Sequence, residues 1–345
     1  MTDLPATMRA AWLHGPGHME LREVPVPRPG PGEVLVKVEA ALTCGTDVKT
    51  FQRGHARLPM PAPFGHEFAG TIAAAGAGVT FAEGARIMCV PTAPCGACAP
   101  CLRGRENLCP HAVGRMVLGA YADYVLLPAH IVQRHLFERP AHLDARHAAL
   151  LEPLACVVQG MARIDSLHAA HVVILGDGPI ALLFAALFTR TSVTPLMLGR
   201  HDSRLAVARG YGAATAIAPD DAAAHQAVRT VAANGADLVV ECVGTPQAWR
   251  LASELAAPGG TVLLFGGCAA GAQACFDATR LHYDEVTITS SFHYGPAAVQ
   301  GAVTALEERA FDPAPLVTHE MPLEKLDDAL ALMASRTAIK VAVLP

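Results

Sequence analysis

The sequence has few charged residues and no excess of basic ones. Charged side chains make up 17% of the 345 residues, and 26 lysines and arginines stand against 31 aspartates and glutamates, for a formal net charge of −5. A protein that neutralises a phosphate backbone needs clustered positive charge, so nucleic acid is not an expected partner. The apolar fraction of 52% argues against disorder and is ample for a large core.

The sequence also lacks a long hydrophobic run. The run near the middle of the chain, Ile180–Phe188, has nine residues, whereas a membrane span needs about 20. The N-terminal stretch has no basic segment that leads into an apolar one, so no secretory signal is expected. We therefore expect a cytoplasmic protein with no membrane partner.

The ten cysteines are too few for a disulfide scaffold in a chain of this length, and they are unevenly distributed. Four of them fall within fifteen residues: Cys95, Cys98, Cys101 and Cys109. Four thiolates at this spacing predict a closed, tetrahedral zinc site with a structural role. An iron–sulfur cluster needs a similar number of ligands and is the alternative.

The composition of the chain changes along its length, and two domains are expected for a protein of this size. Residues 8–150 alternate proline- and glycine-rich turns with short β-type runs such as 34–40, which predicts an irregular all-β domain. From about 155 to 292, apolar strands alternate with helical stretches, the pattern of a parallel sheet covered on both faces. The residues after 293 contain a helix-like stretch, 296–310, and a final short strand that could complete the first domain.

A glycine motif follows the first of these apolar strands. The residues Gly176, Gly178, Pro179, Ile180 and Ala181 form the pattern G-x-G-x-x-A between a strand and a helix. The first glycine permits a tight turn, the second lets the backbone approach a pyrophosphate, and the start of the helix supplies N–H donors. In this context the motif predicts a dinucleotide-binding site.

The end of the next strand bears on the choice of cofactor. An acid there would accept hydrogen bonds from the ribose hydroxyls and favour NAD. The sequence has Arg200 and His201 instead, and Asp202 lies past the end of the strand. Since Arg200 and His201 can pair with a 2′-phosphate, we favour NADP over NAD. The alternative is a solvated arginine in a loop that accepts either cofactor.

A second set of metal-binding residue types is spread along the chain: Cys44, His66, Glu67 and Glu152. Each of them alone would be interpreted as a structural residue. Together with a nucleotide-binding domain, they predict an open zinc site made of a cysteine, a histidine and a carboxylate. Zinc in such a site stabilises developing alkoxide charge while a hydride leaves the adjacent carbon.

These motifs occur in a characteristic order, namely CGTD (44–47), GHE (65–67), the four-cysteine segment, LEPL (151–154), the glycine motif and DLVVECVG (237–244). Over essentially its whole length the sequence resembles the zinc-dependent medium-chain dehydrogenases/reductases. It is most similar to the branch that contains sorbitol (polyol) and threonine dehydrogenases. The resemblance implies a GroES-like catalytic domain at 1–154, to which 293–345 returns, and a Rossmann dinucleotide-binding domain at 155–292. It also implies a homodimer or homotetramer.

The resemblance assigns roles to the metal-binding residues. Cys44 and His66 match the first two ligands of the catalytic zinc. The third ligand is Glu67 or Glu152: in the polyol branch the glutamate that Glu67 matches can ligate directly, while the one that Glu152 matches sits one water away. The four clustered cysteines match the ligands of a structural zinc.

Other roles implied by the resemblance concern the proton and the cofactor. Thr46 matches the hydroxyl that takes the substrate proton. Lys49 stands where family members commonly have the histidine of the proton relay, and a lysine relays protons near neutral pH only where burial or a neighbouring positive charge lowers its pKa. Val243, in DLVVECVG, matches a residue that contacts the cofactor.

The sequence is thus identified as that of an NAD(P)-dependent oxidoreductase that acts on a secondary alcohol. A polyol or sugar alcohol is the expected substrate, and an amino-acid alcohol such as threonine is the alternative. A zinc-free quinone or enoyl reductase of the same superfamily is a further alternative, and a nucleotide-binding protein without activity is another. The complete set of zinc-binding residues counts against both.

Overall fold

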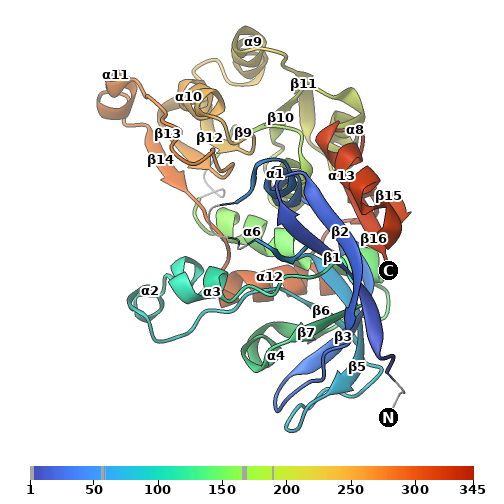
Figure 1. The fold of residues 1–345 in the computed structure, drawn as a ribbon. Helices are drawn as coiled ribbons and strands as arrows, with labels where there is room; N and C mark the ends of the chain where they lie inside the picture. Colours follow the sequence, from blue (N-terminus) through green and yellow to red (C-terminus); the bar gives the residue numbers. More distant parts are fainter. Residues whose placement is uncertain (1–3, 56–57, 59, 165–168, 189) are drawn as a thin grey trace. The chain divides into compact units, whose positions relative to one another are not determined.

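The computed structural model describes residues 4–55, 58, 60–164, 169–188 and 190–345, which divide into two compact units (Figure 1). Unit 1 comprises Met1–Ala155, Tyr294–Glu308 and Pro313–Pro345, and unit 2 comprises Cys156–His293 and Arg309–Asp312. The sequence assigned 309–312 to the first domain instead. In the structure, the main-chain oxygen of Asp312 accepts a hydrogen bond of 2.8 Å from the Tyr211 hydroxyl, which ties this short segment to unit 2.

Unit 2 is built on a parallel sheet with the strand order β11-β10-β9-β12-β13-β14 (Figure 1). Its strands are β9 (Val172–Leu175), β10 (Leu196–Gly199), β11 (Ala214–Ile217), β12 (Ala236–Glu241), β13 (Ala256–Leu264) and β14 (Thr287–Ser290). The chain winds outward from β9 in both directions, which is the Rossmann arrangement and confirms the expected parallel sheet. The point at which the winding reverses lies at the carboxyl end of β9, where the glycine motif follows.

The helices of unit 2 alternate with its strands, and they are α7 (Pro179–Phe188), α8 (Asp202–Gly210), α9 (Asp221–Val231), α10 (Pro246–Leu255) and α11 (Ala278–His282). Helix α7 has no polar face, and every residue from Ala181 to Phe188 is buried. A helix that is apolar all round is one that is covered on all sides. This burial fixes α7 against the sheet, and with it the position of the glycine turn from which the helix starts.

Unit 1 contains a seven-stranded sheet and a three-stranded sheet. The larger sheet holds β3 (Val34–Leu42), β5 (Phe68–Ala75), β6 (Arg86–Cys89), β7 (Tyr124–Leu127), β8 (Leu136–Glu138), β15 (Val317–Pro322) and β16 (Lys340–Leu344). The smaller sheet holds β1 (Thr7–Gly15), β2 (His18–Pro25) and β4 (Ala62–Pro63). In β3, Lys37 is exposed while the valines on either side are buried, as the alternating pattern predicted.

The C-terminal strand belongs to unit 1. β16 pairs with β3 in antiparallel orientation and with β15 in parallel orientation. The last residues of the chain therefore lie beside elements formed by the first hundred, which brings Lys340 next to Thr43.

The expectation of an all-β first domain was wrong in part, because helices interrupt the strands. The helices of unit 1 are α1 (Gly45–Arg53), α2 (Ala99–Leu102), α3 (Pro110–Gly114), α4 (Ala129–His135), α5 (Ala145–Ala148), α12 (Pro296–Glu307) and α13 (Leu326–Ala334), and α6 (Leu151–Met161) begins there. In α1 a reciprocal capping pair, Cys44 and Asp47, satisfies the first backbone N–H groups and starts the helix. Among the described residues, no helix combines the length and the apolar character that crossing a bilayer requires.

Candidate active site and zinc sites

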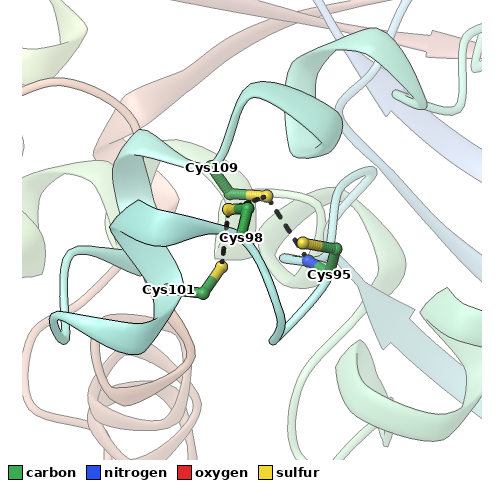
Figure 2. A group of neighbouring side chains, drawn as sticks. All are labelled: Cys95, Cys98, Cys101 and Cys109. Carbon is green, nitrogen blue, oxygen red and sulfur yellow. Dashed lines mark hydrogen bonds between the residues drawn. The ribbon is translucent and has the colours of Figure 1, made fainter.

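The four clustered cysteines point toward one another (Figure 2). All four sulfur atoms lie within 4.8 Å of one another, and Cys98 Sγ is 3.4 Å from Cys101 Sγ and 3.7 Å from Cys109 Sγ. Zinc–sulfur bonds of 2.3 Å in a tetrahedron would place the sulfurs roughly 3.8 Å apart. None of the four is in a disulfide. The donor set therefore fits a closed zinc site.

Local backbone geometry favours the thiolate form of Cys95. The main-chain N–H groups of Ala97 and Cys98 donate to its sulfur and lower its pKa to about 6. The thiolate is the form that binds metal. The intervening Gly96 has φ +75°, a conformation that favours glycine, so the sequence C-G-A-C turns tightly enough to aim these N–H groups at one sulfur.

Cys44 is held at the start of α1 by its own cap. Its sulfur accepts a hydrogen bond of 3.1 Å from the Thr46 N–H, and its main-chain N–H donates to Asp47 Oδ2 at 3.1 Å. The sulfur lies 3.5 Å from His66 Nε2. Ligands bound at the usual Zn–S and Zn–N lengths would lie roughly 3.6 Å apart in a tetrahedral site. Cys44 and His66 are therefore placed as two ligands of one ion would be.

Asp47 orients His66 from the side opposite Cys44. Asp47 Oδ1 lies 3.2 Å from His66 Nδ1, and Oδ2 accepts a hydrogen bond of 2.6 Å from the Tyr121 hydroxyl. Both Asp47 and Tyr121 are buried. Burial lowers the pKa of His66, but Asp47 and Cys44 together raise it by more. The net pKa lies well above the usual value. A carboxylate on Nδ1 fixes the tautomer that presents Nε2 to a metal.

The position before His66 must be glycine. Gly65 has φ +91°, and a Cβ there would lie 2.7 Å from the ring of Tyr121. Any other residue would displace Tyr121, which donates to Asp47. The glycine of GHE thus keeps the support of His66 in place.

Two carboxylates lie close to His66. Ligand atoms of His66, Glu67 and Glu152 are within 4.8 Å of one another, and all three side chains are buried. Lys340 Nζ donates to Glu67 Oε2 and, at 3.1 Å, to the main-chain oxygen of Thr43. The structure thus brings together all four residues of the predicted catalytic set, in two groups that share His66.

Thr46 and Lys49 both lie in α1, one and four residues after its first residue, and both are exposed. The main-chain N–H of Thr46 donates a hydrogen bond to the Cys44 sulfur, so Thr46 lies next to the metal-binding residues. Lys49 lacks the burial on which a relay role for a lysine depends.

The predicted dinucleotide loop has the backbone of a phosphate-binding turn. Gly176 has φ +118°, and a Cβ there would lie 3.2 Å from Val243 Cγ2, so Val243 borders the turn. A Cβ on Gly178 would meet nothing within 4 Å. That open position, directly before the Pro179 start of α7, fits a phosphate group that approaches the backbone.

The loop after β10 is held by an acid from the glycine motif. Asp177 Oδ2 accepts hydrogen bonds from the main-chain N–H groups of Arg200 (2.7 Å) and His201 (3.0 Å) and from His201 Nδ1 (2.9 Å). Arg200 is exposed, and Asp177 is buried. Burial raises the pKa of Asp177, but these donors lower it by more, so the net pKa lies below the usual value.

Four residues that support these sites were not assigned roles from the sequence: Asp47, Tyr121, Lys340 and Asp177. Asp47 stands inside the CGTD motif and Asp177 inside the glycine motif, and the capping pattern at Cys44 was a signal for Asp47. Lys340 carried only the weak signal of a charged residue at the start of an apolar strand.

Comparison with known proteins agrees with this arrangement. The alcohol dehydrogenase GroES-like domain family matches residues 30–135, and the zinc-binding dehydrogenase family matches residues 180–308. A sorbitol dehydrogenase from Halalkalibacterium halodurans is 33% identical over 96% of this chain and 97% of its own length. An L-threonine 3-dehydrogenase from Bacillus velezensis is 31% identical over 94% of this chain and 95% of its own.

A solved structure extends the likeness to three dimensions. A zinc-binding dehydrogenase from Sinorhizobium meliloti, crystallised with NADP, superposes with a TM-score of 0.88 at 32% identity and covers 99% of this chain and 100% of its own. Fold, ligand geometry and whole-length similarity therefore agree. The chain belongs to the zinc-binding alcohol dehydrogenase family and is a nicotinamide-dependent dehydrogenase.

Proposed function

We propose that this dehydrogenase oxidises a secondary alcohol of a polyol or sugar alcohol, with catalytic zinc and with NADP in preference to NAD. The observation that carries the proposal is the placement of Cys44 Sγ 3.5 Å from His66 Nε2, with two carboxylates beside the same histidine. A cysteine, a histidine and one carboxylate make three protein ligands, and catalytic zinc sites with three protein ligands keep the fourth position for water or substrate.

In the proposed site, Cys44 and His66 hold zinc together with a carboxylate oxygen of Glu67 or Glu152. Zinc held there would supply Lewis-acid chemistry toward an alcohol oxygen, and a bound nicotinamide would supply the hydride acceptor. Asp47 keeps His66 in the tautomer that binds metal. Lys340 compensates the buried charge of Glu67.

The proton of the alcohol leaves through the chain's own hydroxyl. Thr46 is exposed and adjoins Cys44, so its hydroxyl accepts the substrate proton while it releases its own proton to water. Lys49, exposed one helical turn along α1 from Thr46, contacts the cofactor or the substrate rather than relaying the proton.

The choice of substrate rests on the relatives. The sorbitol dehydrogenase is slightly more similar to this chain than the threonine dehydrogenase, 33% against 31%. The choice of NADP rests on the exposed Arg200 at the end of β10, and on the NADP in the Sinorhizobium relative. A guanidinium pairs well with a phosphate.

The test is cofactor reduction by the purified protein with polyols, with threonine and with simple secondary alcohols, each with NADP and with NAD. We expect turnover with a polyol and NADP that is lost when zinc is removed and restored when zinc is returned. Turnover with threonine alone would replace the polyol by the amino-acid alcohol. Activity that persists after complete zinc removal, verified by metal analysis, would contradict the zinc mechanism.

A pair of cysteine variants separates the catalytic zinc from the protein as a whole. Cys44→Ala should lose turnover and one zinc per chain while it still binds NADP. Cys275→Ser is the matched control, because Cys275 is exposed and belongs to none of the groups of described residues that could hold a metal. It should keep both zinc ions and full turnover.

A further inference from the structure

In the turn between β10 and α8, any side chain at position 199 would clash with Asp177, which lies far from it in the sequence. We call this clash between positions 177 and 199 the steric lock. A Cβ built on Gly199 would lie 2.8 Å from Asp177 Cβ and 2.9 Å from Asp177 Oδ2. Contacts below 3 Å between such atoms require one of them to move, and a Cβ moves only with its backbone. The third neighbour, Leu205 Cδ2 at 2.9 Å, is the end of a flexible side chain and can turn away.

Position 199, where the steric lock excludes a side chain, is the last residue of β10. An acid at the end of this strand is the group that accepts the ribose hydroxyls in NAD-binding Rossmann domains. Asp177 occupies the space in which such a side chain would begin. Gly199 is therefore the residue that this loop can accommodate.

Asp177 does not itself offer a carboxylate for the ribose. Its Oδ2 atom is used by three donors, the N–H groups of Arg200 and His201 and the His201 ring. Its other oxygen lies 3.9 Å from the buried guanidinium of Arg204, which also donates to the Asp177 main-chain oxygen at 3.3 Å. The carboxylate is turned inward onto the loop that it organises.

We propose that Asp177 is a positioning residue for cofactor specificity: it excludes a ribose-binding acid at position 199 and holds the backbone from which Arg200 meets the 2′-phosphate. The inference rests on the proposed preference for NADP and deepens it. It assigns the preference to a coupled pair, Asp177 and Gly199, and not to Arg200 alone.

The experiment measures dissociation constants for NADP and NAD by calorimetry on the zinc-loaded protein, with circular dichroism and zinc content as checks of folding. Four variants are needed: Gly199→Asp, Asp177→Gly, and the doubles Asp177→Gly/Gly199→Asp and Asp177→Ala/Gly199→Asp. The alanine double is the matched control, because alanine in place of Asp177 keeps the Cβ that lies 2.8 Å from the new side chain.

Gly199→Asp alone should weaken NADP at least tenfold without tightening NAD, because its side chain cannot enter the loop. Asp177→Gly/Gly199→Asp should bind NAD at least tenfold more tightly than the single variant does and should prefer NAD. Asp177→Ala/Gly199→Asp should behave like the single variant. The non-additivity of the two changes measures their coupling.

The inference is overturned if Gly199→Asp alone reverses the preference, or if the alanine and glycine doubles bind NAD equally well. It is also overturned if Asp177→Gly alone weakens NAD and leaves NADP unchanged, since Asp177 would then hold the ribose itself. Failure of the proposed function has a different signature, which is a wild-type protein that binds NAD more tightly than NADP. The comparison of the two doubles tests the lock in that case too.

Discussion

Lys340, the first residue of the last strand, forms a buried ion pair with Glu67, which follows the zinc-binding candidate His66. Both side chains are 2% exposed. Burial raises the pKa of Glu67 and the ammonium of Lys340 opposes the rise, which leaves a net pKa of about 7. For Lys340 burial acts in the opposite direction and lowers the pKa, but Glu67 and Cys44 raise it by more. Each charge is therefore stable in the interior because the other is present.

Breaking this pair should be costly. Lys340→Met leaves the Glu67 carboxylate buried without its partner, and the free energy of unfolding should fall by about 3–5 kcal/mol. Glu67→Gln/Lys340→Met should recover most of the loss, since both charges are then absent. Chemical denaturation of the wild type and of both variants, all freed of zinc because Glu67 is also a candidate ligand, checks the prediction. A double variant as unstable as Lys340→Met would show that the lysine contributes through packing instead.

The carboxylate behind His66 should set the affinity of the proposed catalytic site. Asp47→Asn keeps the shape but removes the charge that holds His66 Nδ1, so zinc affinity should fall about 10–100-fold. Tyr121→Phe is the milder comparison, because it removes one hydrogen bond to Asp47 and leaves the carboxylate. Competition with a chelator of known affinity gives both values. Equal zinc affinity in Asp47→Asn and the wild type would exclude Asp47 from the support of this site.

The four-cysteine site should act on stability and leave the chemistry alone. Cys98→Ser removes one of four ligands from a closed site, and binding at such sites contributes directly to folding. We expect the loss of one zinc per chain and a fall of about 3 kcal/mol in the free energy of unfolding, which corresponds to a fall in Tm of roughly 4 °C for a chain of 345 residues. Turnover per folded molecule should be kept at low temperature. A variant with unchanged Tm and one zinc fewer would mean that the segment folds without its metal.

The parts of the site that the sequence predicted are those whose residues are close in the chain or lie in a fixed local context. The cysteines from Cys95 to Cys109 lie within fifteen residues, so their spacing alone indicates a common ligand. The glycine motif can be recognised from the sequence because the strand, the turn and the helix around it are consecutive in the chain. The parallel sheet followed from continuous apolar strands, since both faces of such a sheet are buried.

The parts that the sequence did not predict depend on long-range contacts. Lys340 forms a hydrogen bond with Glu67, from which it is separated by 273 positions in the sequence, and Tyr121 forms one with Asp47 over a separation of 74 positions. No local pattern encodes such a pair, because only the register of β16 against β3 brings Lys340 to the site. The role of Asp177 could not be predicted from the sequence for a related reason. The motif fixes the glycines around it, but the loop that it binds starts 23 residues later.

We expect a buried histidine, which belongs to neither predicted set of zinc ligands, to make the stability of unit 1 depend on pH. His135 is 2% exposed, its Nδ1 atom donates to the main-chain oxygen of Thr92 at 2.6 Å, and its buried Nε2 atom has no hydrogen-bond partner among the described residues. Burial is the main cause that lowers its pKa below 6.5. The folded state therefore resists a proton that the unfolded state accepts.

The sign of the effect follows from linkage. Above pH 6.5 His135 is neutral in both states, and stability is at its full value; below that pH the unfolded state binds more protons, so stability falls. Between pH 7.5 and 5.5 the wild type should lose up to about 1.4 kcal/mol through this residue. His135→Gln, which can still donate to Thr92, should show a smaller loss when denaturation is compared at the two pH values. His282→Gln removes an exposed histidine and should keep the wild-type difference, and an equal difference in all three proteins would place the pH dependence elsewhere.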